Sequence, residues 1–381
     1  MGEVEGLCAP GWEPVRKAFR ASFTRGEERG ASVAVTRHGE PVVDLWGGDA
    51  DGAGRPWERD TLVNVYSLTK TMAALCTLML ADRGQVDLDA PVATYWPAFA
   101  ANGKDGILLR HVLGHTAGVS GFDPPLPVDD LYDWDLVCDR LAAQAPWWEP
   151  GTASGYHALT QGHILGEVLR RVDGRTMGTF FREEVAEPLG ADFHLGLPRS
   201  EEHRVAEMVP PRDDGGRTAT IGPDASIGAR TLASCPHDGT ESNTRAWREA
   251  EIPAAGGTGN ARSVARIHSA LALGGEVDGV RLLSGATVDR IFEVQADGPD
   301  LVLGRPMRFG MGFGLIGPST PLSPNERAFF WGGWGGSMAV IDLDAEVSIA
   351  YAMNRMADVP LGDMRAVSVI FAAYAALKAG A

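Results

Sequence analysis

Val65–Lys70 (VYSLTK) and the apolar stretch that follows it predict the central element of the fold. Residues 71–83 (TMAALCTLMLADR) place apolar side chains on nearly every side of a helix. A helix from Thr69 to Arg83 should therefore be buried all round, with Gly84 as its C-cap. A lysine at the start of a buried helix needs a partner, and Ser67 lies three residues before Lys70.

Ser67 and Lys70 form a Ser-x-x-Lys pattern whose chemistry depends on its place at a helix start. Residues i and i+3 share one helix face, so Lys70 can reach the Ser67 hydroxyl. The free N–H groups and partial positive charge of a helix N-terminus favour negative charge on Ser67. Burial lowers the pKa of a lysine, which suits it to proton transfer. The alternative is a helix-capping serine beside a solvated lysine, because so short a pattern also occurs by chance.

Two later segments complete a candidate site. Residues 148–157 (WEPGTASGYH) hold Tyr156 among turn-forming residues, at the start of a helix expected from Gly155 to Arg171. Residues 331–337 (WGGWGGS) place glycines in or just before a strand, where a ligand or another backbone can approach closely. The alternatives are a buried core tyrosine and a bulge or crowded contact.

The order of the remaining elements predicts one sheet built from both ends of the chain. Hydrophobic periodicity predicts further helices over residues 12–25, 177–189, 263–272 and 361–378, and a short segment over residues 284–292 follows the third of these. Strand patterns cover residues 31–36, 41–46, 309–316, 328–331, 338–342 and 346–352. Residues 208–258 are rich in Pro, Gly, Asp, Ser and Thr, and extended loops are expected there.

The simplest packing is an α+β fold, in which an antiparallel sheet is flanked by helices and carries an inserted, mostly helical domain. We expect one domain from residues 1–85 together with 255–381, and a second, helical and loop-rich, from residues 86–254. Catalytic sites often lie at such a junction.

Composition argues against several classes of protein. The 381 residues include 34 basic and 50 acidic side chains, a formal net charge of −16, which disfavours binding to nucleic acids and anionic lipid. The longest apolar stretches, residues 71–81 and 367–377, fall short of the roughly 20 residues that cross a bilayer. Four widely spaced cysteines and an acidic first segment without a secretory signal lead us to expect a cytoplasmic protein. The sequence predicts no oligomeric state.

Ser67–Lys70, Tyr156 and Trp331–Gly333, in this order, resemble the serine β-lactamase and penicillin-binding-protein superfamily. More closely, the chain resembles the class C-like esterases known as family VIII carboxylesterases. Further matching segments are residues 113–118 (LGHTAG), 148–156, 188–190 and 196–198. The resemblance covers nearly the whole chain and implies the β-lactamase/transpeptidase-like fold.

The resemblance also implies roles for individual residues. Ser67 would be the acylated nucleophile, Lys70 its general base, and Tyr156 the relay of the proton to the leaving group. Trp331, Gly332 and Gly333 would replace the family's Lys-Thr-Gly strand. The backbone N–H groups of Ser67 and Trp334 would form the oxyanion hole. No cofactor or metal is implied, and the partner is a small-molecule ester.

Two departures from the family pattern bear on the substrate. The Tyr-x-Asn element has become Tyr156-His157-Ala158, and Trp331 and Gly332 replace the lysine and threonine that would hold a substrate carboxylate. An indole cannot pair with a carboxylate charge. We therefore expect a serine carboxylesterase for short-chain, neutral esters, with weak β-lactamase activity at most. Trp134, Trp148 and His157 are candidates for the pocket.

Other hypotheses were weighed against this one. Amidase and transacylase activity would share the acyl-enzyme on Ser67, and an inactive scaffold or binding protein is a remote alternative. Residues 335–339 (GGSMA) nearly match the nucleophile turn of α/β-hydrolases, but strand residues follow and no histidine occurs after Ser337. His111 and His115 are spaced as zinc ligands can be. No catalytic glutamate lies between them, so a structural turn is expected instead.

Overall fold

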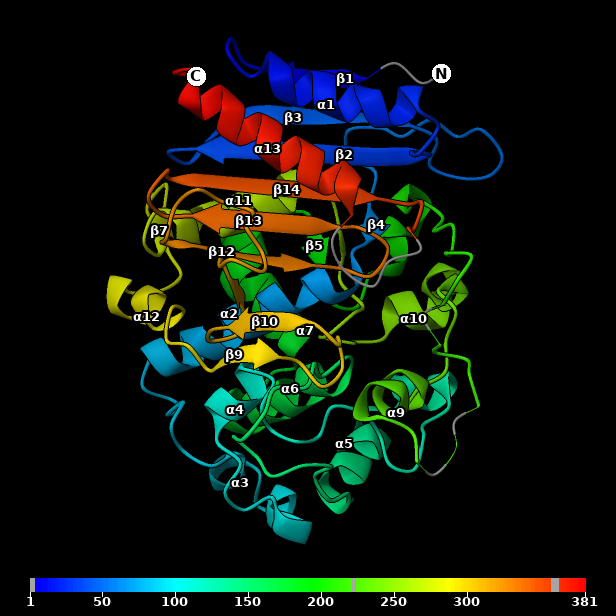
Figure 1. The fold of residues 1–381 in the computed structure, drawn as a ribbon, viewed down its shortest axis with the longest axis vertical. Coiled ribbons are helices and arrows are strands. Elements are labelled where there is room, and N and C mark those ends of the chain that lie inside the picture. The colour runs from blue at the N-terminus through cyan, green and yellow to red at the C-terminus, as the bar shows by residue number, and fades with distance from the viewer. Residues whose placement is uncertain (1–3, 215, 221, 223, 358–362) are drawn as a thin grey trace.

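A nine-stranded antiparallel sheet, made from segments near both ends of the chain, dominates the fold (Figure 1). The computed structural model describes residues 4–214, 216–220, 222, 224–357 and 363–381. In spatial order its strands are β1 (Glu5–Cys8), β3 (Glu40–Gly48), β2 (Gly30–Arg37), β14 (Val347–Met353), β13 (Met338–Asp342), β12 (Ala328–Gly332), β11 (Gly314–Leu315), β10 (Pro306–Phe309) and β9 (Ala296–Pro299). The smaller sheets consist of β4 (Val63–Asn64), β6 (Thr258–Gly259) and β5 (Phe193–His194), and of β7 (Glu276–Val277) and β8 (Val280–Arg281). The predicted α+β fold with a sheet drawn from both chain ends is confirmed.

The central strands are buried on both faces because helices cover the sheet from both sides. β2 pairs with β14 so that Val33 lies opposite Tyr351 and Ala34 opposite Ala350, and every residue of β14 is buried. Helices α1 (Glu13–Thr24) and α13 (Met364–Lys378) pack together on one face, and α11 (Ala261–Ala272) covers the other (Figure 1). Such layering explains why these strands are nearly continuous apolar runs.

Helix α2 (Lys70–Asp82) lies under the sheet layer and is buried from Lys70 to Leu80, as its sequence predicts. The remaining helices are α3 (Val92–Tyr95), α4 (Leu109–Leu113), α5 (Trp134–Ala143), α6 (Thr160–Asp173), α7 (Met177–Phe181), α8 (Glu187–Leu189), α9 (Ile227–Ala233), α10 (Arg245–Glu249) and α12 (Gly285–Arg290). A continuous hydrophobic core joins the sheet, α2 and these helices except α9. The division into two domains therefore remains a prediction.

Several predicted elements are wrong in their bounds. The helix expected from Gly155 begins only at Thr160, because tertiary hydrogen bonds occupy the backbone before it. The strand expected over residues 309–316 is interrupted between β10 and β11. Residues 208–258 contain α9 and α10, each capped by a serine or threonine side chain rather than extended throughout. Residues 361–362 of the expected last helix lie outside the described residues.

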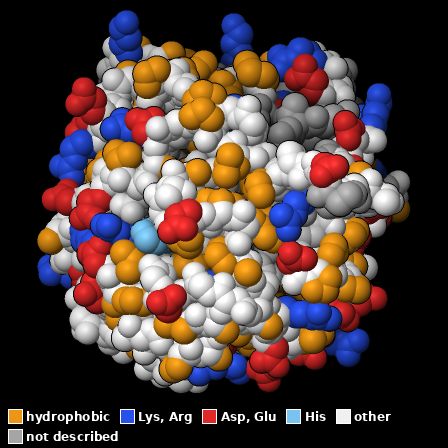
Figure 2. Space-filling view, turned by 60° about the horizontal axis from the view of Figure 1, so that its bottom comes forward, with side chains coloured by type: hydrophobic (Ala, Val, Ile, Leu, Met, Phe, Trp, Pro, Cys, Tyr) orange, Lys and Arg blue, Asp and Glu red, His pale blue; other side chains and the backbone are white. Residues whose placement is uncertain are grey.

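No helix in the described ranges combines the length and apolar composition needed to span a bilayer. Figure 2 shows one face of the molecule, on which acidic and basic side chains are intermixed with apolar ones. The expected cytoplasmic location stays a prediction.

Candidate active site

Ser67 lies in a 3₁₀ turn, Tyr66–Thr69, directly before α2. Tyr66 has a φ of 46°, a left-handed conformation that is strained for a residue with a side chain. Its N–H donates to the Asn64 side chain at 3.1 Å, its hydroxyl donates to the Gly239 carbonyl at 3.1 Å, and its carbonyl accepts from the Thr69 hydroxyl. These contacts hold the turn, so Ser67 is presented at the end of a rigid, buried helix.

The side chain of Lys70 is fully buried, and its Nζ lies 3.1 Å from Ser67 Oγ. Nζ also donates to the carbonyls of Ala158 and Ala254, at 2.7 and 2.9 Å. Burial, with a smaller contribution from the charge of Arg217, lowers the pKa of Lys70 well below its usual value. A neutral amine has two N–H donors and one lone pair. The two carbonyls accept the donors, which directs the lone pair to the Ser67 hydroxyl.

The Tyr156 hydroxyl lies 2.5 Å from Ser67 Oγ, on an irregular segment before α6. The segment is fixed by the backbone N–H of Tyr156, which donates to the buried Asp300 carboxylate at 3.1 Å, and by a hydrogen bond from Leu301 N–H to the Ser154 carbonyl at 2.8 Å. Burial raises the pKa of Tyr156, so the phenol is protonated and can donate to Ser67.

The turn after β12 lies against the turn that carries Ser67. A side chain at Gly333 would overlap the Val65 carbonyl, so only glycine lets this turn approach the Ser67 turn so closely. Among the described residues, no backbone or side-chain oxygen accepts a hydrogen bond from the N–H of Ser67 or of Trp334. An oxyanion hole needs two free N–H groups beside the nucleophile, so these two N–H groups stay the predicted donors.

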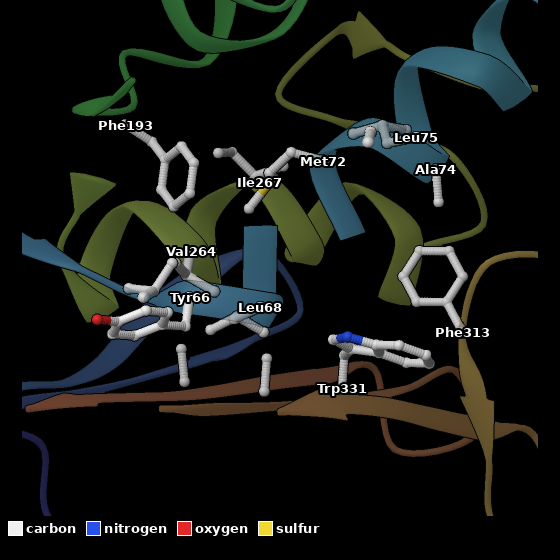
Figure 3. Packing of buried hydrophobic residues seen from close by; sticks show 14 of the residues in the cluster. Tyr66, Leu68, Met72, Ala74, Leu75, Phe193, Val264, Ile267, Phe313 and Trp331 are labelled. Atoms are coloured by element: carbon white, nitrogen blue, oxygen red, sulfur yellow. The ribbon is translucent and has the colours of Figure 1, made fainter. Parts of the chain in front are cut away.

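His115, expected only to form a turn, supports this site. Its ring stacks on Trp331 with centroids 5.4 Å apart, and its Nδ1 accepts from the His157 N–H at 3.0 Å. Burial lowers the pKa of His115 well below its usual value, so the ring is neutral. Figure 3 shows Trp331 rising from its strand toward the layer that contains Tyr66 and Leu68, the neighbours of Ser67. The Trp331 Nε1 is buried and has no acceptor in the described part of the chain.

Comparison with known proteins agrees with this arrangement. The sequence profile of the beta-lactamase family matches residues 15–374. This chain belongs to the beta-lactamase family. A solved structure of a family VIII carboxylesterase covers 98% of the chain and 100% of its own length, at 46% identity and a TM-score of 0.91. The predicted resemblance is thereby confirmed.

Two further relatives have names other than family VIII carboxylesterase. The solved structure of a penicillin-binding protein homologue from Caulobacter crescentus covers 98% of the chain and 100% of its own, at 40% identity and a TM-score of 0.90. Esterase/beta-lactamase LipL from Mycobacterium tuberculosis is 38% identical over 363 residues, which are 93% of this chain and 83% of LipL. Shared ancestry thus spans esterases and penicillin-binding homologues.

The three predicted pocket residues, Trp134, Trp148 and His157, lie in different surroundings. Trp148 packs against Gly155 and donates from Nε1 to the Ala153 carbonyl at 3.0 Å, so it braces the segment that carries Tyr156. His157 is buried, with Nδ1 bonded to the Gly155 carbonyl at 2.7 Å. Trp134 packs on α6 and lines an open cavity of about 520 Å³, whose lining does not include Ser67, Lys70 or Tyr156. Contact of Trp134 with the substrate stays a prediction.

The two motifs set aside in the sequence, residues 335–339 and the pair His111 and His115, show no sign of a separate site within the described part of the chain. Ser337 is buried, and its Oγ has no partner among the described residues, while its carbonyl accepts from Gly333 N–H at 2.7 Å. His111 Nδ1 accepts from the Leu108 N–H at 3.2 Å. In the described ranges, no three His, Cys, Asp or Glu side chains converge as a metal site would require.

Proposed function

We propose that this protein is a serine carboxylesterase that forms an acyl-enzyme on Ser67. The observation that carries the proposal is the position of Ser67 Oγ, 3.1 Å from Lys70 Nζ and 2.5 Å from the Tyr156 hydroxyl. The 46% identity to a family VIII carboxylesterase over nearly the full length supports ester hydrolysis. Homologues with esterase names support the same reaction.

In the acylation step, Ser67 Oγ attacks the ester carbonyl carbon and its proton passes to Lys70 Nζ, which is neutral at the outset. The N–H groups of Ser67 and Trp334 stabilise the oxyanion. The C–O bond to the alcohol then breaks, and the leaving oxygen takes the proton of the Tyr156 hydroxyl. The ammonium of Lys70 returns a proton to the phenolate, directly or through water, because Lys70 Nζ and the Tyr156 oxygen both lie within hydrogen-bond distance of Ser67 Oγ.

Deacylation repeats these steps with water as the nucleophile. Water adds to the acyl carbonyl while neutral Lys70 accepts its proton. The C–O bond to Ser67 then breaks, Ser67 Oγ takes the proton of the Tyr156 hydroxyl, and the Lys70 ammonium returns a proton to the phenolate. No step needs a metal or an organic cofactor. The choice of a short acyl chain is our proposal, because the buried Trp331 and Trp334 rings crowd the surroundings of Ser67, with centroids 6.1 Å from Tyr156 and 5.2 Å from Tyr66.

The test is intact-protein mass spectrometry after brief exposure to 4-nitrophenyl butyrate, a fluorophosphonate, a cephalosporin and an anilide. We expect an adduct on Ser67 and fast turnover of the ester. Ser67→Ala should remove the adduct and the turnover, whereas Ser337→Ala, at the other serine motif, should keep both. Full turnover by Ser67→Ala, or no adduct from any reagent, would contradict the proposal.

A second function has its own support. LipL carries both esterase and beta-lactamase in its name, and another relative is a penicillin-binding protein homologue. β-Lactam hydrolysis uses the same acyl-serine chemistry. An acyl adduct that accumulates from the cephalosporin would mark slow deacylation of lactams, and rapid turnover of the cephalosporin would place lactams among the substrates.

A further inference from the structure

Arg217 differs from the other buried arginines in having no acidic partner. Three arginines are buried among the described residues, and two of them face carboxylates. Arg365 pairs with Glu28 at 3.0 Å and with Asp363, while Arg248 faces Glu202 at 3.7 Å.

No described carboxylate lies within ion-pair distance of Arg217, whose Nη1 donates to the Asp214 backbone carbonyl at 2.7 Å. The Asp214 carboxylate acts on Arg217 only through its charge, from beyond that distance. A guanidinium has five N–H donors, and this hydrogen bond uses one of them. Burying a charge without an ion pair is costly, and an arginine in this state is suited to an anionic ligand.

The guanidinium of Arg217 lies beside the proposed oxyanion hole. Its central carbon is 3.8 Å from the ring centroid of Trp334, whose backbone N–H we place in that hole. The Trp334 ring also packs against the rings of Tyr66 and His237, with centroid distances of 5.2 and 5.4 Å. The indole is thus held between Tyr66, next to Ser67, and Arg217, which places a cation one side chain away from the Ser67 turn.

The charge of Arg217 reaches the reacting groups. Burial lowers the pKa of Arg217 to about 10, so it stays cationic at neutral pH. Its charge lowers the pKa of Lys70 and opposes the rise that burial causes in the pKa of Tyr156. His237 does not offset it, because burial and the same cation lower the pKa of His237 to about 4 and keep its ring neutral.

We propose that Arg217 is a specificity-determining residue that binds a carboxylate carried by the ester substrate. The favoured class is esters with an acidic group a few atoms from the ester carbonyl, such as half-esters of short dicarboxylic acids. A guanidinium matches a carboxylate with two parallel hydrogen bonds. The proposal rests on the carboxylesterase function and departs from the expectation of neutral substrates. A cation from the segment before α9 takes over the task of the lysine that Trp331 replaces.

Matched substrates test the proposal. 4-Nitrophenyl hydrogen succinate and 4-nitrophenyl butyrate have acyl chains of equal length and differ in the terminal carboxylate. A second pair, 4-acetoxybenzoate and phenyl acetate, places the carboxylate on the alcohol side. For at least one pair, Arg217→Met should lower kcat/KM for the anionic ester by about tenfold or more relative to the neutral one, mainly through KM. Arg217→Lys should restore part of the loss.

Arg230 supplies the control. Its guanidinium also stacks on a tryptophan, 4.1 Å from the Trp147 ring centroid, but it pairs with Asp123 at 3.1 Å. Arg230→Met removes the same charge and should leave both substrate ratios unchanged. Equal losses with the anionic and neutral esters in Arg217→Met, or an unchanged ratio in both pairs, would overturn the proposal. Butyrate hydrolysis that survives Ser67→Ala would instead overturn the carboxylesterase function.

Discussion

Lys70 and Lys104 are two fully buried lysines in different parts of the molecule, and neither pairs with a carboxylate of the described residues. The Lys104 Nζ donates to three backbone carbonyls, those of Ala101, Ala142 and Gln144. Lys70 donates to two carbonyls, and its third neighbour is the Ser67 hydroxyl. Burial lowers the pKa of Lys104 to about 8, and it lowers the pKa of Lys70 well below the usual value.

The third neighbour of the Nζ atom distinguishes Lys104, a structural lysine, from Lys70, which we propose to be catalytic. Three carbonyls satisfy all three donors of an ammonium, so Lys104 is held charged at neutral pH and ties loop segments together. Two carbonyls and a hydroxyl instead match a neutral amine, which can take a proton from Ser67. Burial alone therefore does not make a base, and the predictions below test this distinction.

The largest effect should come from Lys70→Met. Methionine fills similar space but cannot accept the proton of Ser67, so kcat for 4-nitrophenyl butyrate should fall by about 10²–10⁴. Steady-state kinetics measure the loss, and circular dichroism checks that the variant is folded. A folded variant that keeps most of its activity would remove the difference between the two lysines.

Gly333→Ala should give the next largest loss while leaving both lysines in place. The new methyl group would overlap the Val65 carbonyl and displace the Trp334 N–H, and losing one oxyanion donor costs about 10²–10³ in kcat. Gly317→Ala is the control, since the nearest atom to its added methyl, on the Arg308 side chain, is 3.8 Å away. Equal kcat values for the two variants would argue against the Trp334 N–H as a donor.

Lys104→Met should affect folding and not catalysis. Three carbonyls lose their buried donor, so the free energy of unfolding should fall by about 1–3 kcal/mol. Urea unfolding measures this change, and kcat per folded molecule should match the unsubstituted protein. A fall in kcat comparable with that of Lys70→Met would show that the two lysines share a role.

The pH dependence of kcat/KM should follow Lys70. Its pKa is lowered well below the usual value, chiefly by burial, so the active neutral form persists to lower pH than in an exposed lysine and is lost as the pH falls through that pKa. The rate should therefore decline as the pH falls through the lowered pKa and be level above it. His115 and His157 face the same site, but burial holds their pKa values below the usual 6.5. A rate that rises only near the ordinary lysine pKa of 10.5 would exclude Lys70 as a neutral base.

Arg217→Met should produce the smallest effect. It should displace the acid limb, the part of the pH profile in which kcat/KM falls as Lys70 becomes protonated. Removing a nearby cation raises the pKa of Lys70, so the limb should move to higher pH, by about one unit or less. The profile with 4-nitrophenyl butyrate measures the displacement, because this ester has no carboxylate of its own. Arg230→Met should leave the limb in place, and a shift to lower pH in Arg217→Met would contradict the electrostatic coupling.

Much of the fold could be predicted from local sequence patterns. The apolar run after Lys70 predicts a helix buried on every side, and strand patterns at both chain ends predict the shared sheet. The helix start near Tyr156 could not be predicted, because the N–H groups of Tyr156 and His157 bond to Asp300 and His115, which are distant in the sequence. Local propensity carries no information about such partners.

By itself, the sequence determined the identity and order of the reactive groups, since Ser67 and Lys70 need only one turn of helix to meet. Only the tertiary structure decided their state. The carbonyls of Ala158 and Ala254 that leave Lys70 neutral belong to backbone that any residue could supply, so no sequence pattern marks them. The same holds for Arg217, whose charge matters because folding buries it against Trp334 without an acidic partner among the described residues.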